Sequence, residues 1–320
     1  VLVKDIKAGA KGSEPTLLTN VGGTLFFAAS DGIVGRELWK SDGTPAGTVL
    51  VKDINAGEDG SKLASFVDFG GTLFFSAYTL AEGRELWKSD GTPAGTVLVT
   101  DINAGVSDSS PSNLTVVGGT LYFSATDPVN GAELWKTTGG PATLVRDINP
   151  GFDGSRPGSL IDVGGTLFFA ATTRGAGREL WKSDGTFNGT VQVRDIHAAP
   201  APTEAVNVNG TIFFVANNPQ WGTELWRTDP VQGAVLVKDI YAGTSSSSPT
   251  RLTAMNGLLY FRANDGTNGV ELWRSDGTSA GTYMVRNISS LGNSTPDNLT
   301  VFNNVLYFNS TPVAPSVAEK

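Results

Sequence analysis

The feature that most constrains the fold is an internal repeat. The tripeptide Glu-Leu-Trp occurs six times, at intervals of 45 to 48 residues, beginning at Glu37, Glu85, Glu133, Glu179, Glu224 and Glu271. Two further motifs, Gly-Thr-Leu-Phe-Phe and Lys/Arg-Asp-Ile with small changes, recur seven times at similar spacing. A period of about 20 to 50 residues means that one supersecondary unit is copied along the chain and that neighbouring copies bury each other's apolar faces.

Each period is predicted to contain four short antiparallel strands. In the first period these strands are Leu17–Val21, Thr24–Ala29, Arg36–Ser41 and Thr48–Ile54. Gly22-Gly23 separates the first two strands, and glycine accepts the positive φ of a tight two-residue hairpin. Asp42 follows the third strand, where its side chain can accept a hydrogen bond from the backbone two residues on.

The second strand of each period decides between β architectures. Leu25, Phe26 and Phe27 are consecutive apolar residues, and successive side chains of a strand point to opposite faces, so both faces must be buried. A two-sheet sandwich normally leaves one face of each sheet polar. A propeller buries both faces, because each small sheet packs between two copies of itself. An open solenoid would also do so, but it needs polar end caps that neither end of this sequence supplies.

The two ends of the chain set the number of blades. The sequence begins with the last strand of a period, Val1–Ile6, runs through six complete periods over residues 7–295, and ends with the first two strands of a period over residues 296–310. We therefore predict one all-β domain over residues 1–320, a seven-bladed β-propeller of four-stranded antiparallel blades. Its closing blade combines the N-terminal strand with the C-terminal strands. The closing blade has three strands unless the tail, residues 311–320, supplies a poor fourth, because its prolines donate no ladder bond.

Composition agrees with this fold and excludes several functions. Gly contributes 40 of the 320 residues, well above the average of roughly 7%, which favours many tight turns. The net charge of −8 disfavours nucleic-acid binding, and no apolar run is long enough to span a membrane. The chain has no Cys, and His197 is its only histidine, with no nucleophile motif beside it. We predict no catalytic residue, no cofactor and no metal site.

The longer form of the repeat motif is similar to the repeat of a known protein family. Glu-Leu-Trp-Lys-Ser-Asp-Gly-Thr begins at Glu37, Glu85 and Glu179, and in this motif the chain resembles the bacterial ELWxxDGT repeat proteins over almost its whole length. The resemblance implies an extracellular or cell-surface location, and the motif itself implies no enzymatic activity. Two copies depart from the motif, after Trp135 and after Trp226, which predicts altered turns there. A looser likeness is to the Trp-repeat propeller lectins, which bind sugars between neighbouring blades.

Residues that recur in every blade are interpreted as framework. The Trp residues of the motif are predicted to pack between blades rather than to stack on a ligand. The Glu residues before them need partners on a half-buried strand, either a basic residue of the fourth strand, such as Lys52 or Arg146, or backbone amides of a turn. The Asp of the Lys-Asp-Ile motif is predicted to cap a turn or a strand end. At the seventh position Asn287 replaces this Asp, which favours hydrogen bonding over metal binding.

Function is predicted where the repeats differ, in the loops between the second and third strands and between one period and the next. Aromatic residues outside the repeat columns occur there among Asn, Asp and Arg. Such a mixture suits sugars, because C–H faces stack on rings and hydroxyls need planar donors and acceptors. The predicted ligand-binding residues are Tyr78, Phe152, Arg174, Asn218, Trp221 and Tyr241. As an alternative, Trp221 is a packing anchor of its loop.

These observations predict a non-enzymatic module that binds carbohydrate or acts in adhesion through its variable-loop face. One alternative is a structural or protein-interaction propeller module of a larger surface protein. Another is a glycosidase or lyase, which would need two carboxylates about 5 to 9.5 Å apart in one pocket. The expected partners are carbohydrate or a surface protein, with neither nucleic acid nor membrane insertion, and the chain is predicted to be a monomer.

Overall fold

The computed structural model describes residues 2–9, 12–175, 177–194, 204–229, 233–289 and 292–310, which form strands and turns without an α-helix. The chain divides into two compact units. The first comprises Val1–Gly165 and Asp184–Thr190, and the second comprises Thr166–Ser183 and Val191–Lys320. In the part of the chain that the structure describes, no helix has the length and apolar character needed to cross a membrane.

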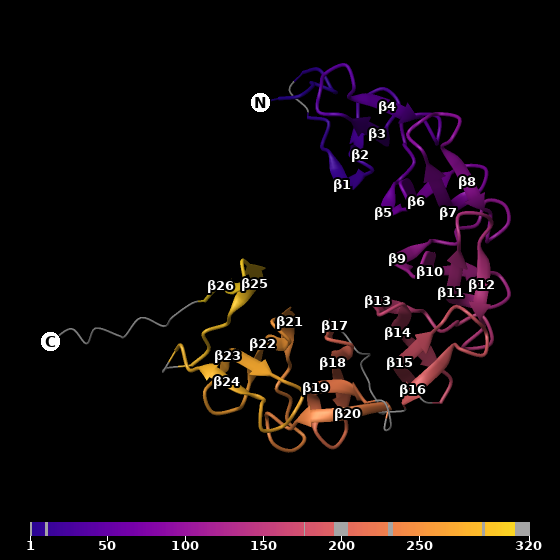
Figure 1. Ribbon diagram of the computed structural model, residues 1–320. Helices are drawn as coiled ribbons and strands as arrows, with labels where there is room; N and C mark the ends of the chain where they lie inside the picture. Colours follow the sequence, from indigo (N-terminus) through magenta and orange to yellow (C-terminus); the bar gives the residue numbers. More distant parts are fainter. Residues whose placement is uncertain are drawn as a thin grey trace. The chain divides into compact units, whose positions relative to one another are not determined.

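Six four-stranded antiparallel sheets, here named blades one to six, follow one another along the chain with their strands in sequence order (Figure 1). Blade one contains β1 (Thr16–Val21), β2 (Thr24–Ser30), β3 (Arg36–Ser41) and β4 (Val49–Lys52). Blade two contains β5 (Ala64–Phe69), β6 (Thr72–Thr79), β7 (Gly83–Ser89) and β8 (Val97–Thr100). Blade three contains β9 (Ser112–Val117), β10 (Thr120–Asp127), β11 (Gly131–Thr137) and β12 (Thr143–Arg146).

Blade four contains β13 (Gly158–Val163), β14 (Thr166–Thr173), β15 (Gly177–Ser183) and β16 (Val191–Arg194). Blade five contains β17 (Ala205–Val208), β18 (Thr211–Asn218), β19 (Gly222–Asp229) and β20 (Gly233–Lys238). Blade six contains β21 (Thr250–Met255), β22 (Leu258–Asn264), β23 (Val270–Ser275) and β24 (Tyr283–Arg286). A small seventh sheet pairs β25 (Asp297–Phe302) with β26 (Val305–Asn309). The prediction of an all-β propeller fold is confirmed, with six four-stranded antiparallel sheets and a small seventh sheet. That the small sheet closes the propeller together with the N-terminal strand stays a prediction.

Local chemistry in blade one explains why each period forms a meander. Gly22 and Gly23 join β1 to β2 with φ angles of 56° and 87°, which side chains other than hydrogen rarely permit. The Oδ1 atom of Asp42 accepts a hydrogen bond from the backbone N–H of Thr44 at 2.9 Å, and this contact shapes the turn between β3 and β4. Both turns occur where the sequence predicts them.

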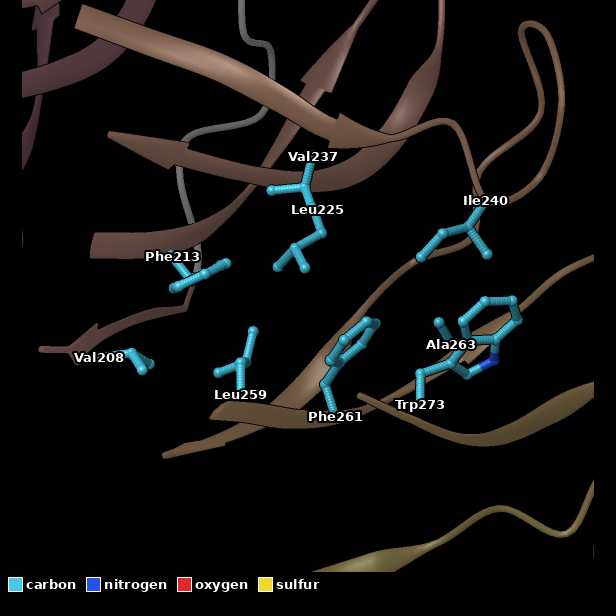
Figure 2. Close-up of a cluster of buried hydrophobic side chains, with 9 residues drawn as sticks. All are labelled: Val208, Phe213, Leu225, Val237, Ile240, Leu259, Phe261, Ala263 and Trp273. Carbon is cyan, nitrogen blue, oxygen red and sulfur yellow. The ribbon is translucent and has the colours of Figure 1, made fainter. Parts of the chain in front are cut away.

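Packing between consecutive blades buries the second strand on both faces, as its run of apolar residues requires. In the first unit, Phe26 of blade one and Phe75 of blade two belong to one buried cluster. In the second unit, Phe213 of blade five lies in a cluster with Phe261 and Trp273 of blade six (Figure 2). The first strands of successive blades also lie side by side, β1 with β5, β5 with β9 and β9 with β13 in the first unit, and β17 with β21 and β21 with β25 in the second.

The N-terminal segment differs from its prediction in one respect. Residues 2–6 of the predicted strand Val1–Ile6 belong to no sheet. However, Lys4 Nζ donates a hydrogen bond to the carbonyl oxygen of Thr48 at 2.7 Å, just as Lys52 Nζ of β4 donates to that of Thr96 in blade two at 2.7 Å. Relative to blade one, the segment therefore holds the position of the outermost strand of a preceding blade. Its pairing with β25 and β26 stays a prediction.

Candidate functional site

Where the structure describes the loop that follows a blade, the recurring Glu of that blade anchors it. Glu224 of blade five is fully buried. Its Oε1 accepts the N–H of Ser247 at 2.9 Å, and its Oε2 accepts the Ser247 hydroxyl at 2.5 Å and the N–H of Ile240 at 3.1 Å. A serine hydroxyl and loop amides bind the carboxylates of four other blades in the same way, those of Glu37, Glu85, Glu133 and Glu271. Of the two predicted kinds of partner, loop amides are therefore the ones observed.

Burial dominates the electrostatics of these carboxyl groups. Desolvation raises the pKa of Glu37 and of Glu224 to about 7, because a low dielectric disfavours the charged form. Burial also raises the pKa of Glu85 and of Glu133 above the usual range for a carboxyl group. In each case the hydrogen bonds donated by the loop oppose the shift. The side chains are 0% exposed, so they hold the loops and do not face a substrate.

The other recurring residues connect neighbouring blades. The basic residue that ends the fourth strand reaches a threonine carbonyl of the next blade, as the 2.7 Å bond from Lys238 Nζ to the carbonyl oxygen of Thr282 shows. The motif Trp side chains are buried in five blades, with Trp226 only 4% exposed, and Trp135 is half-buried. The prediction that these Trp residues pack between blades is confirmed. The Oδ2 atom of Asp239 accepts the N–H of Gly243 at 3.0 Å, which is the predicted turn cap.

At the blade junctions whose loops the structure describes, the two variable loops contact each other closely. A Cβ atom added to Gly131, at the start of β11, would lie 2.5 Å from the carbonyl oxygen of Phe152 in the following loop. Gly131 also has a φ of 70°, so only glycine fits there without strain. The variable loops are therefore parts of a packed scaffold.

Two of the predicted ligand-binding residues lie in the first unit. Tyr78 is half-buried, and Lys62 Nζ lies 4.3 Å from the centroid of its ring, so a cation already occupies that face. Phe152 is 86% exposed, and it contributes its backbone, not its ring, to the junction with Gly131. Tyr78 thus makes its contact through its ring, and Phe152 makes its contact through its backbone.

The remaining predicted residues lie in the second unit. The ring of Trp221 packs edge-on against the motif residue Trp226, with ring centroids 5.9 Å apart, and its backbone N–H donates to the carbonyl oxygen of Asn218 at 3.1 Å. Asn218 and Trp221 therefore adjoin, and the Trp221 ring contacts the framework, as the alternative interpretation of a packing anchor requires. Tyr241 lies at another junction, where a Cβ added to Gly266 would come within 2.4 Å of its ring.

The other candidate groups add no assembled site. Arg174 is exposed on the loop after β14. His197 and the tail over residues 311–320 lie outside the described residues. Among the residues that the structure does describe, no group of three or more His, Cys, Asp or Glu side chains is placed to hold a metal ion.

The first strand of each blade has one edge that pairs with no other strand. In blades one and two, β1 pairs with β2 and β5 pairs with β6, and these first strands end their sheets. Leu17 and Ser65 have φ angles of 58° and 57° at irregularities in this pairing, so each of these first strands carries a β-bulge against its partner strand. Edges of this kind carry backbone donors and acceptors that an extended peptide can use.

A pocket that the sequence analysis did not predict lies between blades four and five of the second unit. Its volume is about 490 Å³, and Phe168, Lys182, Thr228 and Asp229 contribute to its lining. The signal for it was present in the sequence, because the motif departs from the repeat after Trp226. That departure was interpreted only as an altered turn.

Comparisons with known proteins give a fold and no family. No model of a known protein family matches the chain, and no curated protein matches it. Among solved structures, the chain is similar to a prolyl endopeptidase studied for the role of inter-domain dynamics in catalysis and specificity. The TM-score is 0.53 and the identity 13%, over 93% of this chain and 46% of that one.

Two further solved structures are similar at lower scores. One is a puromycin-hydrolysing peptidase from Mycobacterium tuberculosis, with a TM-score of 0.46 and 13% identity over 95% of this chain and 51% of that one. The other is the β-propeller domain of the Trilobed protease from Pyrococcus furiosus, with a TM-score of 0.44 and 10% identity over 85% of this chain and 84% of that one. The chain spans about half the length of the prolyl endopeptidase and of the mycobacterial peptidase.

These comparisons correct the functional prediction. The prediction of a carbohydrate-binding or adhesive module is wrong, because the chain shares its fold with a prolyl endopeptidase, which is not a lectin. Neither of the two alternatives named a peptidase. The likeness to lectins rested on blade length and motif Trp residues, and the structure assigns those Trp residues to the framework.

Proposed function

We propose that this chain is the β-propeller part of a peptidase, a non-catalytic unit that admits and positions peptides for a separate catalytic part. The observation that carries the proposal is the likeness to the prolyl endopeptidase, which extends over 93% of this chain but only 46% of the solved one. More than half of that enzyme has no counterpart in this sequence, which leaves a place for a catalytic domain outside it.

The chemistry of the blades supports a role in binding peptides. The first strands of successive blades lie side by side within each unit, and each has an unpaired edge. An extended peptide can add to such an edge through main-chain hydrogen bonds, which require no particular sequence. The recurring carboxyl groups, by contrast, are buried and occupied by loop amides, so they supply structure and not bond cleavage.

The experiment measures binding and hydrolysis with the chain alone. A fluorescein-labelled, unstructured decapeptide containing proline is titrated with the chain and followed by anisotropy, and hydrolysis is followed with a fluorogenic Gly-Pro amide. We expect saturable binding and no hydrolysis. The matched control is the same peptide with N-methylated backbone amides, which cannot pair with a strand edge and is expected to bind much more weakly.

Three outcomes would overturn the proposal. Hydrolysis of the amide by the chain alone would show that the chain is itself the enzyme. Equal binding of the N-methylated peptide would remove the strand-edge chemistry. Specific binding on a glycan array, without any peptide binding, would return the chain to the class of lectins.

A further inference from the structure

Apolar side chains that project into solvent gather at one end of the strands in the first unit. Among the described residues, six large apolar side chains are more than two-thirds exposed, and one of them, Leu2, lies near the N-terminus. The other five lie in loops that follow the second or the fourth strand of a blade, namely Ile33, Leu80, Val106, Val129 and Phe152. Each blade is a meander, so these two kinds of loop lie at the same end of its strands. A single exposed apolar side chain is common on a protein surface, but five at one end form a distinct surface.

The loops that carry four of these side chains follow one another in blades two and three and contact each other. The N–H of Leu80 donates to the Oδ1 atom of Asn55 in the preceding loop at 3.1 Å. The N–H of Thr126 in blade three donates to the carbonyl oxygen of Ser109 at 2.8 Å, and Gly131 lies against the loop that follows blade three. These loops, here named the loop surface, comprise residues 55–62, 78–84, 103–110, 126–132 and 149–157.

The apolar side chains are not needed to hold the loops in shape. In the loop after blade two, the Nδ2 atom of Asn103 donates to the carbonyl oxygen of Asp108 at 3.1 Å. The N–H of Gly105 donates to the Oδ2 atom of Asp101 at 3.0 Å. These polar contacts close the loop, whereas the side chain of Val106 at its tip is 74% exposed. The loop therefore fixes the position of an apolar side chain that contributes little to the packing of the blades.

The described loops of the second unit carry polar residues at the same positions. These residues are exposed, and they are Arg174, Gln220, Thr244 and Thr267. The repeat thus accepts a polar side chain at the tip of either kind of loop. The apolar tips of the first unit are therefore not a requirement of the fold, and exposed loop residues of this kind point to binding.

Acidic side chains accompany the apolar tips. The exposed charged residues of the loop surface are Glu58, Asp59, Asp108 and Asp153 on the acidic side and Lys62 and Arg156 on the basic side. Asp153 directly follows the apolar tip residue Phe152. The ammonium group of Lys62 lies 4.3 Å from the centroid of the Tyr78 ring. The loop surface is therefore apolar at its tips and acidic beside them, so its complement is a surface that is apolar and basic.

We propose that the loop surface binds a basic amphipathic segment of another polypeptide, in which Lys or Arg residues flank apolar side chains. The apolar side chains of the segment pack on the four tips, and its cations lie beside Glu58 and Asp153. A lipid bilayer is a poorer match, because anionic headgroups repel the carboxylates beside the tips. This site goes beyond the proposed function, since it uses the loops of the first unit and not the strand edges.

A synthetic peptide of Leu and Lys is the probe. The peptide Leu-Lys-Lys-Leu-Leu-Lys-Leu-Leu-Lys-Lys-Leu-Leu-Lys-Leu is labelled with fluorescein and titrated with the full chain by anisotropy. We expect saturable binding. Combining Leu80→Ser, Val106→Ser, Val129→Ser and Phe152→Ser should weaken it about tenfold or more, because the apolar area of the tips is lost while the net charge is kept. The same peptide with Glu in place of each Lys is expected not to bind, because its charge repels the acidic loops.

A matched variant separates binding at the tips from a general effect of lost apolar surface. Phe187 is 60% exposed, but it lies in the turn between β15 and β16, at the other end of the strands. Phe187→Ser is therefore expected to leave the affinity for the Leu-Lys peptide unchanged. Thermal unfolding checks that both variants are folded. The proline-containing decapeptide that probes the strand edges should bind the four-residue variant as it binds the unaltered chain, so the two proposals fail separately.

The carboxylates are tested by a second variant. Glu58→Gln combined with Asp153→Asn keeps the four tips, and we expect it to bind the Leu-Lys peptide more weakly at low ionic strength and nearly unchanged at high ionic strength, because salt screens exposed charges. Equal binding of the Glu-containing peptide would overturn the basic character of the partner. The proposal is also overturned if the four-residue variant binds as tightly as the unaltered chain. Absence of saturable peptide binding would overturn it as well, and binding to phosphatidylcholine and phosphatidylglycerol vesicles through the tips would then assign them to a lipid surface.

Discussion

Replacement of Glu224 by Gln tests the role of the buried carboxyl groups most directly. The carboxyl group accepts four hydrogen bonds and donates none, since its partners are the N–H groups of Ser247, Tyr241 and Ile240 and the Ser247 hydroxyl. Gln has nearly the same size, but its Nε2 atom carries two hydrogens and accepts nothing. Whichever way the amide is turned, two of the four donors lose their acceptor.

The cost follows from the burial of those donors. A buried donor without a partner costs about 1 to 3 kcal/mol, so two of them cost about 2 to 6 kcal/mol. Removal of the buried charge, whose burial raises the pKa from 4.5 to about 7, returns about 3 kcal/mol of this cost, so Glu224→Gln should lower the free energy of unfolding by up to about 3 kcal/mol. This is a large part of the roughly 5 to 15 kcal/mol that stabilises a typical domain. A substitution that leaves the volume of a side chain unchanged would thus act as strongly as a deletion in the core.

Urea unfolding at pH 8, followed by Trp fluorescence, measures this difference. At that pH the carboxyl group is ionised, since its pKa is about 7. The matched control is Glu58→Gln at an exposed position, which should change stability by less than about 0.5 kcal/mol. A double-mutant cycle with Ser247→Ala isolates the hydroxyl contact. If Glu224→Gln unfolds within 0.5 kcal/mol of the unaltered chain, the loop is not anchored by this carboxylate and the reasoning fails.

Three further changes have defined outcomes. Burial raises the pKa of Glu37 and Glu224 from 4.5 to about 7, so the folded chain binds protons more tightly than the unfolded chain. Its free energy of unfolding should therefore fall as pH rises from 5 to 8. Urea titrations at fixed ionic strength measure this, and a free energy of unfolding that rises over this pH range would contradict it. Gly277→Ala should cost about 1 to 2 kcal/mol, because φ is 91° there and the added Cβ meets Phe213, and an unchanged melting temperature would argue against that strain. Phe261→Ala should cost about 3 to 5 kcal/mol as the side chain is fully buried, and a loss below 1 kcal/mol in calorimetry would show that the cluster collapses around the gap.

The fold was predictable because its determinants are local and repeated. Consecutive apolar residues at Phe26 and Phe27 require two buried faces, and the structure buries both residues. Gly22-Gly23 and Asp42 specify their turns through φ angles and a single hydrogen bond. Each of these signals appears in several copies, so a chance match in one copy carries little weight. Strand number and order follow from them without any knowledge of long-range contacts.

The N-terminal strand was not predictable from its own residues, because a strand requires a partner. In blade one, β4 pairs with β3, which contains Glu-Leu-Trp. Residues 2–6 belong to no sheet in the part of the chain that the structure describes. Lys4 still makes the contact with Thr48 that its motif predicts. The lysine contact of the motif is therefore kept, although residues 2–6 form no strand.

The two departures from the motif show why the functional residues were harder to recognise. Both were predicted to alter a turn, but they differ in one chemical respect. After Trp135 the motif glycine is kept as Gly139, and its carbonyl oxygen still accepts from Lys88 Nζ at 2.8 Å. After Trp226 that position is Pro230, and Lys182 of the preceding blade is exposed. A change in the motif alters the contact between two blades when it removes the residue that the neighbouring blade binds. The structure is needed to identify that residue.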